Sequence, residues 1–142
     1  MTATRSKRKR KSPAARAHTA KSRNNRYSAD ALTRIAVAAL EDTKAINVKV
    51  LDVRTLTDVT DTMIVATGNS DRHVKSIADR VVERCREAGH RAFGVEGHRE
   101  GEWVLVDLQD LIVHVMLPRI REFYGLEKLW DVRPAQREPS PA

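Results

Sequence analysis

Two acidic side chains at a predicted tight turn are the first candidates for chemistry. Asp107 and Asp110 stand on either side of Leu108 and Gln109, directly after an apolar strand-like run. Paired carboxylates in such a place can hold a divalent metal ion for phosphoryl transfer. Aspartate is also common in turns, because its side chain hydrogen-bonds the nearby backbone. We favour the turn interpretation and keep the metal site as the alternative.

A second candidate is a glycine-containing segment ahead of a predicted helix. Gly68, Asn69 and Ser70 would place free amide groups at the helix start, where phosphate can bind. The segment has neither the lysine nor the spacing of a P-loop. A nucleotidyltransferase would also need an Asp-x-Asp pair on a following strand, whereas Asp79 lies inside the predicted helix and is followed by Arg80. The sequence fails the requirement of that enzyme class.

The histidines and the single cysteine form no pattern typical of a metal site. No two of the five histidines have the His-x-x-x-His spacing, and Cys85 has no second cysteine for a disulfide or a zinc site. We expect Cys85 to be a buried thiol. His114 alternates with Ile112 and Met116 along a predicted strand, so we interpret it as a core histidine. We predict no enzymatic activity, no metal and no cofactor.

The strand that carries Trp103 is better suited to binding than to catalysis. Side chains alternate along a strand, so Trp103, Leu105 and Asp107 share one face while Val104, Val106 and Leu108 share the other. If the valine face fills the core, Trp103 and Leu105 lie near the surface. An aromatic side chain beside an aliphatic one can form an interaction hot spot there. Covering the end of a helix is the alternative role for Trp103.

Apolar side chains also crowd the C-terminal end of the predicted domain. They either fix the last helix to the sheet or form a self-association surface. The residues are Phe123, Tyr124, Leu126, Leu129 and Trp130.

Helices and a sheet must position these side chains. Apolar residues three and four apart, together with capping residues, predict helices over 28–43, 70–89 and from Pro118 onwards. Runs of β-branched or alternating residues predict strands at 48–53, 62–67, 91–95, 102–108 and 111–117. The first two strands should pair, and the last two should form a closing hairpin. The predicted fold is an α/β or α+β two-layer domain with a mixed sheet of about five strands and three helices.

The net charge of +7 belongs to one segment of the chain. Residues 1–26 hold ten lysines and arginines and no acid, whereas residues 27–142 hold 16 basic and 19 acidic side chains, a net −3. Because residues 1–26 offer almost no large apolar side chain, we expect them to be disordered, as we do the proline-rich residues 134–142. The basic segment is either a weak contact for RNA phosphates or a solubilising leader. The predicted domain spans residues 27–133.

No apolar run is long enough for a membrane-spanning helix, and no secretory signal follows the basic start. With the single cysteine, this predicts a soluble, cytoplasmic protein.

Several of these segments together resemble the ribosomal silencing factor family, also called the Iojap family. The resemblance spans residues 28–131. The matching segments are Asp61-Thr62-Met63-Ile64-Val65-Ala66-Thr67-Gly68, Ser70 with Arg72-His73, Trp103 to Asp107, Asp110-Leu111-Ile112-Val113-His114-Val115-Met116, and Arg121-Glu122-Phe123-Tyr124-Gly125-Leu126-Glu127-Lys128-Leu129-Trp130.

The resemblance implies a fold similar to nucleotidyltransferases but without their catalytic acids. It also implies a translational repressor that binds the L-fourteen protein of the large ribosomal subunit and sterically prevents the small subunit from joining when nutrients are short. A homodimer is a further expectation for the free protein. The implied docking residues are Trp103, Leu105, Leu108 and Met116, with Asp107, Asp110, His114 and Tyr124 in support.

Three qualifications accompany this resemblance. Leu105 and Leu108 lie on opposite faces of a regular strand, so both can contact a partner only if the strand end twists or bulges. The long basic leader and Gln109, where the family often has glycine, depart from the pattern. The competing functions are nucleotide binding through Asp107 and Asp110, and direct RNA binding by the domain, which its net charge of −3 disfavours.

Overall fold

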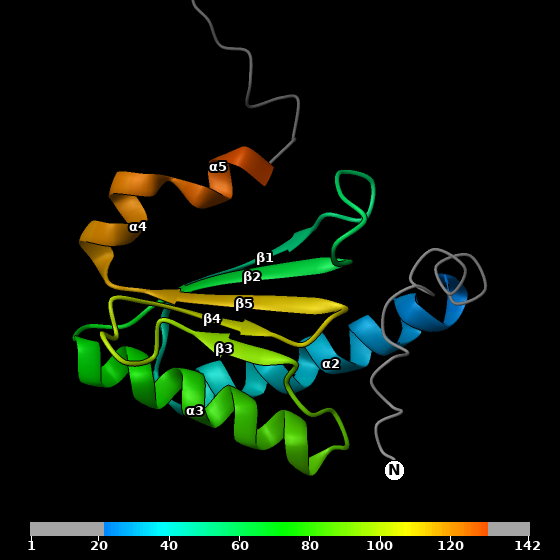
Figure 1. Ribbon diagram of the computed structural model, residues 1–142, viewed down its shortest axis with the longest axis horizontal. Coiled ribbons are helices and arrows are strands. Elements are labelled where there is room, and N and C mark those ends of the chain that lie inside the picture. Colours follow the sequence, from blue (N-terminus) through cyan, green and yellow to red (C-terminus); the bar gives the residue numbers. More distant parts are fainter. Residues whose placement is uncertain (1–21, 131–142) are drawn as a thin grey trace, which may run out of the picture.

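The computed structural model describes residues 22–130 as one sheet with helices on both faces (Figure 1). Helices α2 and α3 cover one face, and α4 and α5 lie over the other (Figure 1). The mixed five-stranded sheet and the α+β class are as predicted, with a fourth helix added. In chain order the elements are α2 (Ser22–Asp42), β1 (Ile46–Asp52), β2 (Thr62–Thr67), α3 (Asp71–Glu87), β3 (Gly94–Glu96), β4 (Trp103–Asp107), β5 (Leu111–Met116), α4 (Pro118–Tyr124) and α5 (Leu126–Trp130).

The sheet has the strand order β1-β2-β5-β4-β3. Strands β2 and β5 run parallel, and the other neighbouring pairs run antiparallel. The predicted pairing of the first two strands and the predicted closing hairpin of β4 and β5 are both confirmed. Strand β2 lies inside the sheet and is buried along its whole length, in keeping with its unbroken apolar and β-branched run.

The main core lies between the sheet and the helices α2 and α3. Helix α3 begins at its N-cap Ser70 and turns one apolar stripe toward the sheet. That stripe includes Cys85, which is buried as predicted, and burial raises the pKa of its thiol to about 11. The buried residues of the stripe are Val74, Ile77, Ala78, Val81 and Cys85.

Two helix boundaries differ from those predicted. No proline or glycine interrupts residues 22–42, and α2 begins at Ser22 instead of Ser28, so the boundary predicted at residue 26 falls inside this helix. The predicted last helix is two helices, because Gly125 adopts a left-handed conformation with φ of 55° and ends α4. Residues 1–21 and 131–142 lie outside the described part of the chain; they include the rest of the predicted basic tail, the predicted tail 134–142 and the last three residues of the predicted domain.

Candidate functional site

The two aspartates at the β4–β5 turn shape the backbone. The carboxylate of Asp107 accepts a hydrogen bond from the Gln109 amide at 2.9 Å, as the turn interpretation predicts. The carbonyl of Asp110 accepts from the amides of Asp61 and Thr62, which fixes the turn to the start of β2. Within residues 22–130, no group of three or more histidine, cysteine or acidic side chains is placed to hold a metal ion.

The amide groups of the candidate phosphate-binding segment at the start of α3 are bonded to the protein's own side chains. The amide of Asn69 donates to Nδ1 of His73 at 2.9 Å, and the amide of His73 donates to Oγ of Ser70 at 3.1 Å. Nε2 of His73 bonds the carbonyl of Thr43, at the end of α2, at 2.8 Å. His73 therefore joins two helices, and these amides are engaged in capping.

We call the sheet face that α4 and α5 cover the second face (Figure 1). The side chains of β4 alternate between this face and the main core, as the sequence predicts. Val104 and Val106 are fully buried in the main core, whereas the side chains of Trp103 and Leu105 are partly exposed on the opposite face. Trp103 pairs with Met116 of β5, and Leu105 pairs with His114. The face assignment for β4 is therefore confirmed, and Trp103 lies on the side of the sheet that α4 covers.

His114 contacts the indole ring of Trp103 through a hydrogen bond and through ring packing. Nε1 of Trp103 donates to Nδ1 of His114 at 3.0 Å, and the two ring centroids lie 5.9 Å apart. His114 is buried, and this desolvation lowers the pKa of its imidazole from 6.5 to about 4. The imidazole is thus neutral near pH 7, with Nδ1 as the acceptor. His114 is a core histidine, as predicted, and its hydrogen bond goes to the candidate docking residue.

Tyr124 and Phe123 extend the exposed aromatic area from the end of α4. The Tyr124 ring packs against Trp103 with centroids 5.1 Å apart and planes tilted by 52°. Phe123 meets Tyr124 edge-on at 4.9 Å. Phe123 is 78% exposed and Tyr124 is 55% exposed. We call Trp103, Leu105, Phe123 and Tyr124 the aromatic surface.

Two of the four predicted docking residues do not reach this surface. Leu108 continues the alternation of β4 and is buried in the main core under α2 and α3. Met116 does point to the second face, but it is fully buried. It pairs with Trp103 on one side and with Thr67 on the other, inside the sheet. Leu108 and Met116 are therefore buried in the fold, and only Trp103 and Leu105 of the four predicted docking residues lie on the aromatic surface.

The crowded C-terminal apolar residues divide into a buried group and an exposed group. Leu126 and Trp130 of α5 pack on the buried Leu51, Val53 and Met63, and so fix this helix to the second face of the sheet. Phe123, Tyr124 and Leu129 stay exposed.

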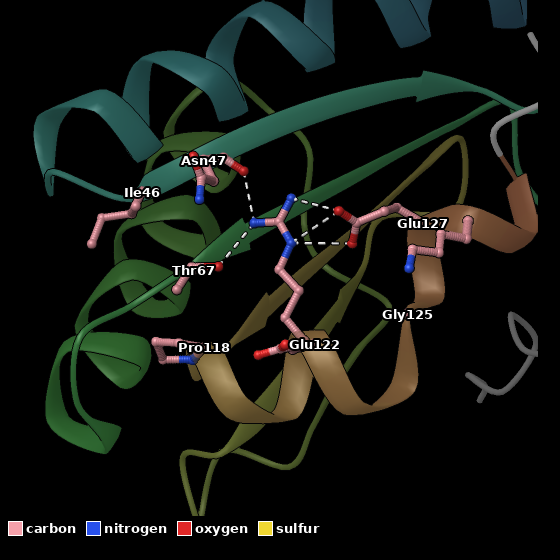
Figure 2. Close-up of a pocket in the computed structure, with 9 residues that line it drawn as sticks. Ile46, Asn47, Thr67, Pro118, Glu122, Gly125 and Glu127 are labelled. Carbon is pink, nitrogen blue, oxygen red and sulfur yellow. Dashed lines mark hydrogen bonds and ion pairs between the residues drawn. The ribbon is translucent and has the colours of Figure 1, made fainter. Parts of the chain in front are cut away.

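One functional candidate escaped the analysis of residue patterns. Arg121 of α4 donates hydrogen bonds to Asn47, Thr67 and Glu127, drawn as dashed lines in Figure 2. Two of these partners lie 54 and 74 residues away in the sequence. The only local signal was an arginine followed six residues later by Glu127, which alone predicts no contact.

No helix within residues 22–130 is long and apolar enough to cross a membrane.

Comparison with known proteins shows the family to which this chain belongs. Residues 26–141 match the family model described as ribosomal silencing factor during starvation. The chain is 48% identical over 99 residues to a ribosomal silencing factor from Chromobacterium violaceum, covering 70% of this chain and 81% of that protein. A crystal structure of a Chromobacterium violaceum protein matches with a TM-score of 0.71 at 45% identity, covering 80% of this chain and 91% of the other.

A more distant relative is the mouse protein named mitochondrial assembly of ribosomal large subunit protein 1. It is 31% identical over 102 residues, which cover 68% of this chain and 44% of that protein. The family match, the identities and the shared fold agree with the segments in which the sequence resembles this family. The chain belongs to the ribosomal silencing factor family, a family of regulatory factors and not of known enzymes.

Proposed function

We propose that this chain represses translation by docking on the L-fourteen protein of the large ribosomal subunit, where it blocks joining of the small subunit when nutrients are short. Membership of the ribosomal silencing factor family supports a ribosomal partner. The name of the mouse relative points to the large subunit in the same way. We also propose that the protein acts in the cytoplasm.

The aromatic surface is the observation that carries the proposal. Trp103 and Tyr124 contact each other, Phe123 packs on Tyr124, and both rings of α4 are more than half exposed. Tryptophan and tyrosine dominate the energetic centres of protein interfaces, because they bury a large area at a small entropic cost. Such a cluster is costly to leave in water and is suited to a partner that covers it.

The charge of the domain favours a protein partner over RNA. Residues 27–142 carry a net charge of −3, which opposes contact with a phosphate backbone.

Trp103 is prepared for this role by its supports. The hydrogen bond to His114 and the contact with Tyr124 fix the indole ring before a partner arrives. A side chain that is already ordered loses less conformational entropy on binding, which increases affinity. Self-association of the free protein through the same surface would compete with docking, and we include a homodimer in the proposal on that basis.

Titration of isolated L-fourteen protein with the full chain tests the docking surface. Trp103→Ala should weaken binding by about 30-fold or more, the effect of losing an interface hot spot of about 2 kcal/mol. Phe93→Ala is the matched control, because Phe93 is also an exposed aromatic residue but precedes the edge strand β3. A folded Trp103→Ala protein that binds as tightly as wild type would show that the surface is wrong.

A further inference from the structure

Arg121 is a mostly buried cation that joins four elements of the fold. Its side chain is 12% exposed. Nη1 donates to the carbonyl of Asn47 in β1 at 2.7 Å and to Oγ1 of Thr67 in β2 at 2.8 Å. Nε and Nη2 donate to the carboxylate of Glu127 in α5 at 3.1 to 3.2 Å. One guanidinium on α4 therefore contacts both strands and the following helix (Figure 2).

Strand β1 is distorted at the point where it meets Arg121. Asn47 adopts φ of 50°, in the left-handed region, and the register with β2 shifts between Ile46 and Lys49. A bulge of this kind turns a backbone group out of the regular ladder. Here the Asn47 carbonyl accepts a hydrogen bond from Arg121, so the irregular part of β1 supplies one of the acceptors of this side chain.

Glu127 completes the site as a charged acceptor. The hydrogen bonds from Arg121 and its positive charge lower the pKa of this carboxyl against the opposing effect of desolvation. The pair lies beside a groove of about 380 Å³ whose lining includes Asn47, Thr67, Gly125 and Lys128. Because Arg121 already donates to three partners, the groove is better explained as the seam between α4 and the sheet than as a ligand site.

The position of Arg121 links this site to the aromatic surface. Thr67, Met116 and Trp103 are register partners, so they form one row across β2, β5 and β4. Arg121 and Tyr124 lie three residues apart on α4 and therefore on the same side of the helix. Arg121 bonds Thr67 at one end of the row, and Tyr124 packs on Trp103 at the other end.

We infer that Arg121 is a positioning residue of the docking surface: it fixes α4 across the sheet and thereby holds Tyr124 against Trp103. This inference rests on the proposed docking function. The planar guanidinium fork can bond Glu127 and the strand acceptors at once, in different directions. A lysine ammonium, with three donors on one nitrogen, cannot reach both sets of partners from the same position.

The test uses the full chain with Trp130→Phe, which leaves Trp103 as the only tryptophan. Arg121→Met and Arg121→Lys are compared with Arg119→Met, the matched control on the same helix. Arg119 is 64% exposed, and its guanidinium lies 3.6 Å from the carboxylate of Glu102. Acrylamide quenching reports the exposure of Trp103, and sedimentation reports affinity for isolated large subunits. All measurements are made under conditions in which far-ultraviolet circular dichroism shows that each variant is folded.

We expect both Arg121 variants to expose Trp103 to the quencher and to weaken subunit binding about tenfold, which corresponds to the loss of an aromatic contact worth about 1.4 kcal/mol. The Arg119→Met protein should match its parent in both measurements. If Arg121→Met does not fold, Glu127→Gln, which keeps an acceptor but removes the ion pair, should show the same changes to a smaller extent.

The two claims fail in different ways. Unchanged quenching of Trp103 in the folded Arg121 variants, or an equal change in the Arg119 control, would overturn the inference while leaving the docking function in place. Increased quenching with normal subunit affinity, together with normal affinity of Trp103→Ala, would overturn the proposed docking surface and with it the role of Arg121 in docking.

Discussion

At the scale of single residues, the Trp103–His114 hydrogen bond couples a partly exposed recognition side chain to a buried one. The indole N–H of Trp103 donates to Nδ1 of His114. Without this donor, the buried Nδ1 would lose its hydrogen bond. Leaving such a group unpaired is costly, so the pair stabilises the fold as well as the orientation of Trp103.

Replacing Trp103 with phenylalanine keeps an aromatic ring but removes the donor. The free energy of unfolding should fall by about 1–3 kcal/mol more than in the control Trp130→Phe, because Nδ1 of His114 is left unsatisfied. The control is matched, since the buried Nε1 of Trp130 has no hydrogen-bond partner within residues 22–130. Urea unfolding at neutral pH measures both. Equal losses in the two variants would contradict the role given to the hydrogen bond.

His114 also gives the protein a specific pH dependence. The pKa of this imidazole is 6.5 ordinarily and about 4 in the folded protein. Below about pH 6.5 the unfolded chain binds a proton that the folded chain does not, so stability present at neutral pH is lost as the pH falls toward 4. The full loss is about 3 kcal/mol.

Urea unfolding between about pH 7 and pH 5 separates this effect from that of Glu127. The pKa of Glu127 is lowered from 4.5, so its contribution is lost only at more acidic pH. In His114→Asn, whose amide oxygen can replace Nδ1 as acceptor, the free energy of unfolding should vary much less over this range. An identical slope in wild type and variant would show that another group titrates.

At the scale of elements, the β4–β5 turn contains a strained residue. The amide of Asp110 donates to the carbonyl of Leu108 across Gln109, whose φ is 74°. This is a γ-turn with a positive φ, a conformation that costs a residue with a side chain about 1–3 kcal/mol. A glycine at this position would adopt it freely.

Gln109→Gly should therefore raise the free energy of unfolding by about 1 kcal/mol, after the greater chain entropy of glycine in the unfolded state is subtracted. Gln109→Ala is the control, since alanine meets the same backbone strain as glutamine. Thermal unfolding compares the three proteins. If Gln109→Gly does not raise the free energy of unfolding, or if Gln109→Ala raises it equally, the turn does not strain the backbone at residue 109.

The elements were predictable where one short-range pattern decides them. Strand β2 was predicted at its observed bounds, Thr62–Thr67, because its apolar and β-branched residues are buried on both faces. The break at Gly125 was missed because apolar residues continue beyond it. The burial of Met116 could not be predicted, because alternation assigns a residue to a face but cannot show what covers that face. The Arg121 contacts depend on strands distant in sequence, which no local pattern reveals.

At the scale of the whole molecule, the cluster of basic side chains and the aromatic surface lie in different segments of the chain. Residues 1–26 carry ten basic side chains without an acid, while the remaining chain is net acidic. The proposed docking belongs to the domain, and we propose that the basic segment adds a weak contact with ribosomal RNA. Counterions displaced from phosphates by lysine and arginine make such a contact sensitive to salt.

Deletion of residues 1–21 tests this contact and leaves α2, which starts at Ser22, intact. The logarithm of the affinity for large subunits should depend less steeply on the logarithm of salt concentration, by about 0.9 for each phosphate contact removed. Binding to isolated L-fourteen protein should not change. The same salt slope with and without these residues would refute the RNA contact.

Subunit joining tests the central claim most directly. Large subunits are mixed with small subunits and saturating wild-type or Trp103→Ala protein, and complete ribosomes are measured by light scattering. The account predicts that the wild-type protein keeps the subunits apart and that Trp103→Ala allows them to join. Normal joining in the presence of wild-type protein, or a block that persists in folded Trp103→Ala, would contradict it.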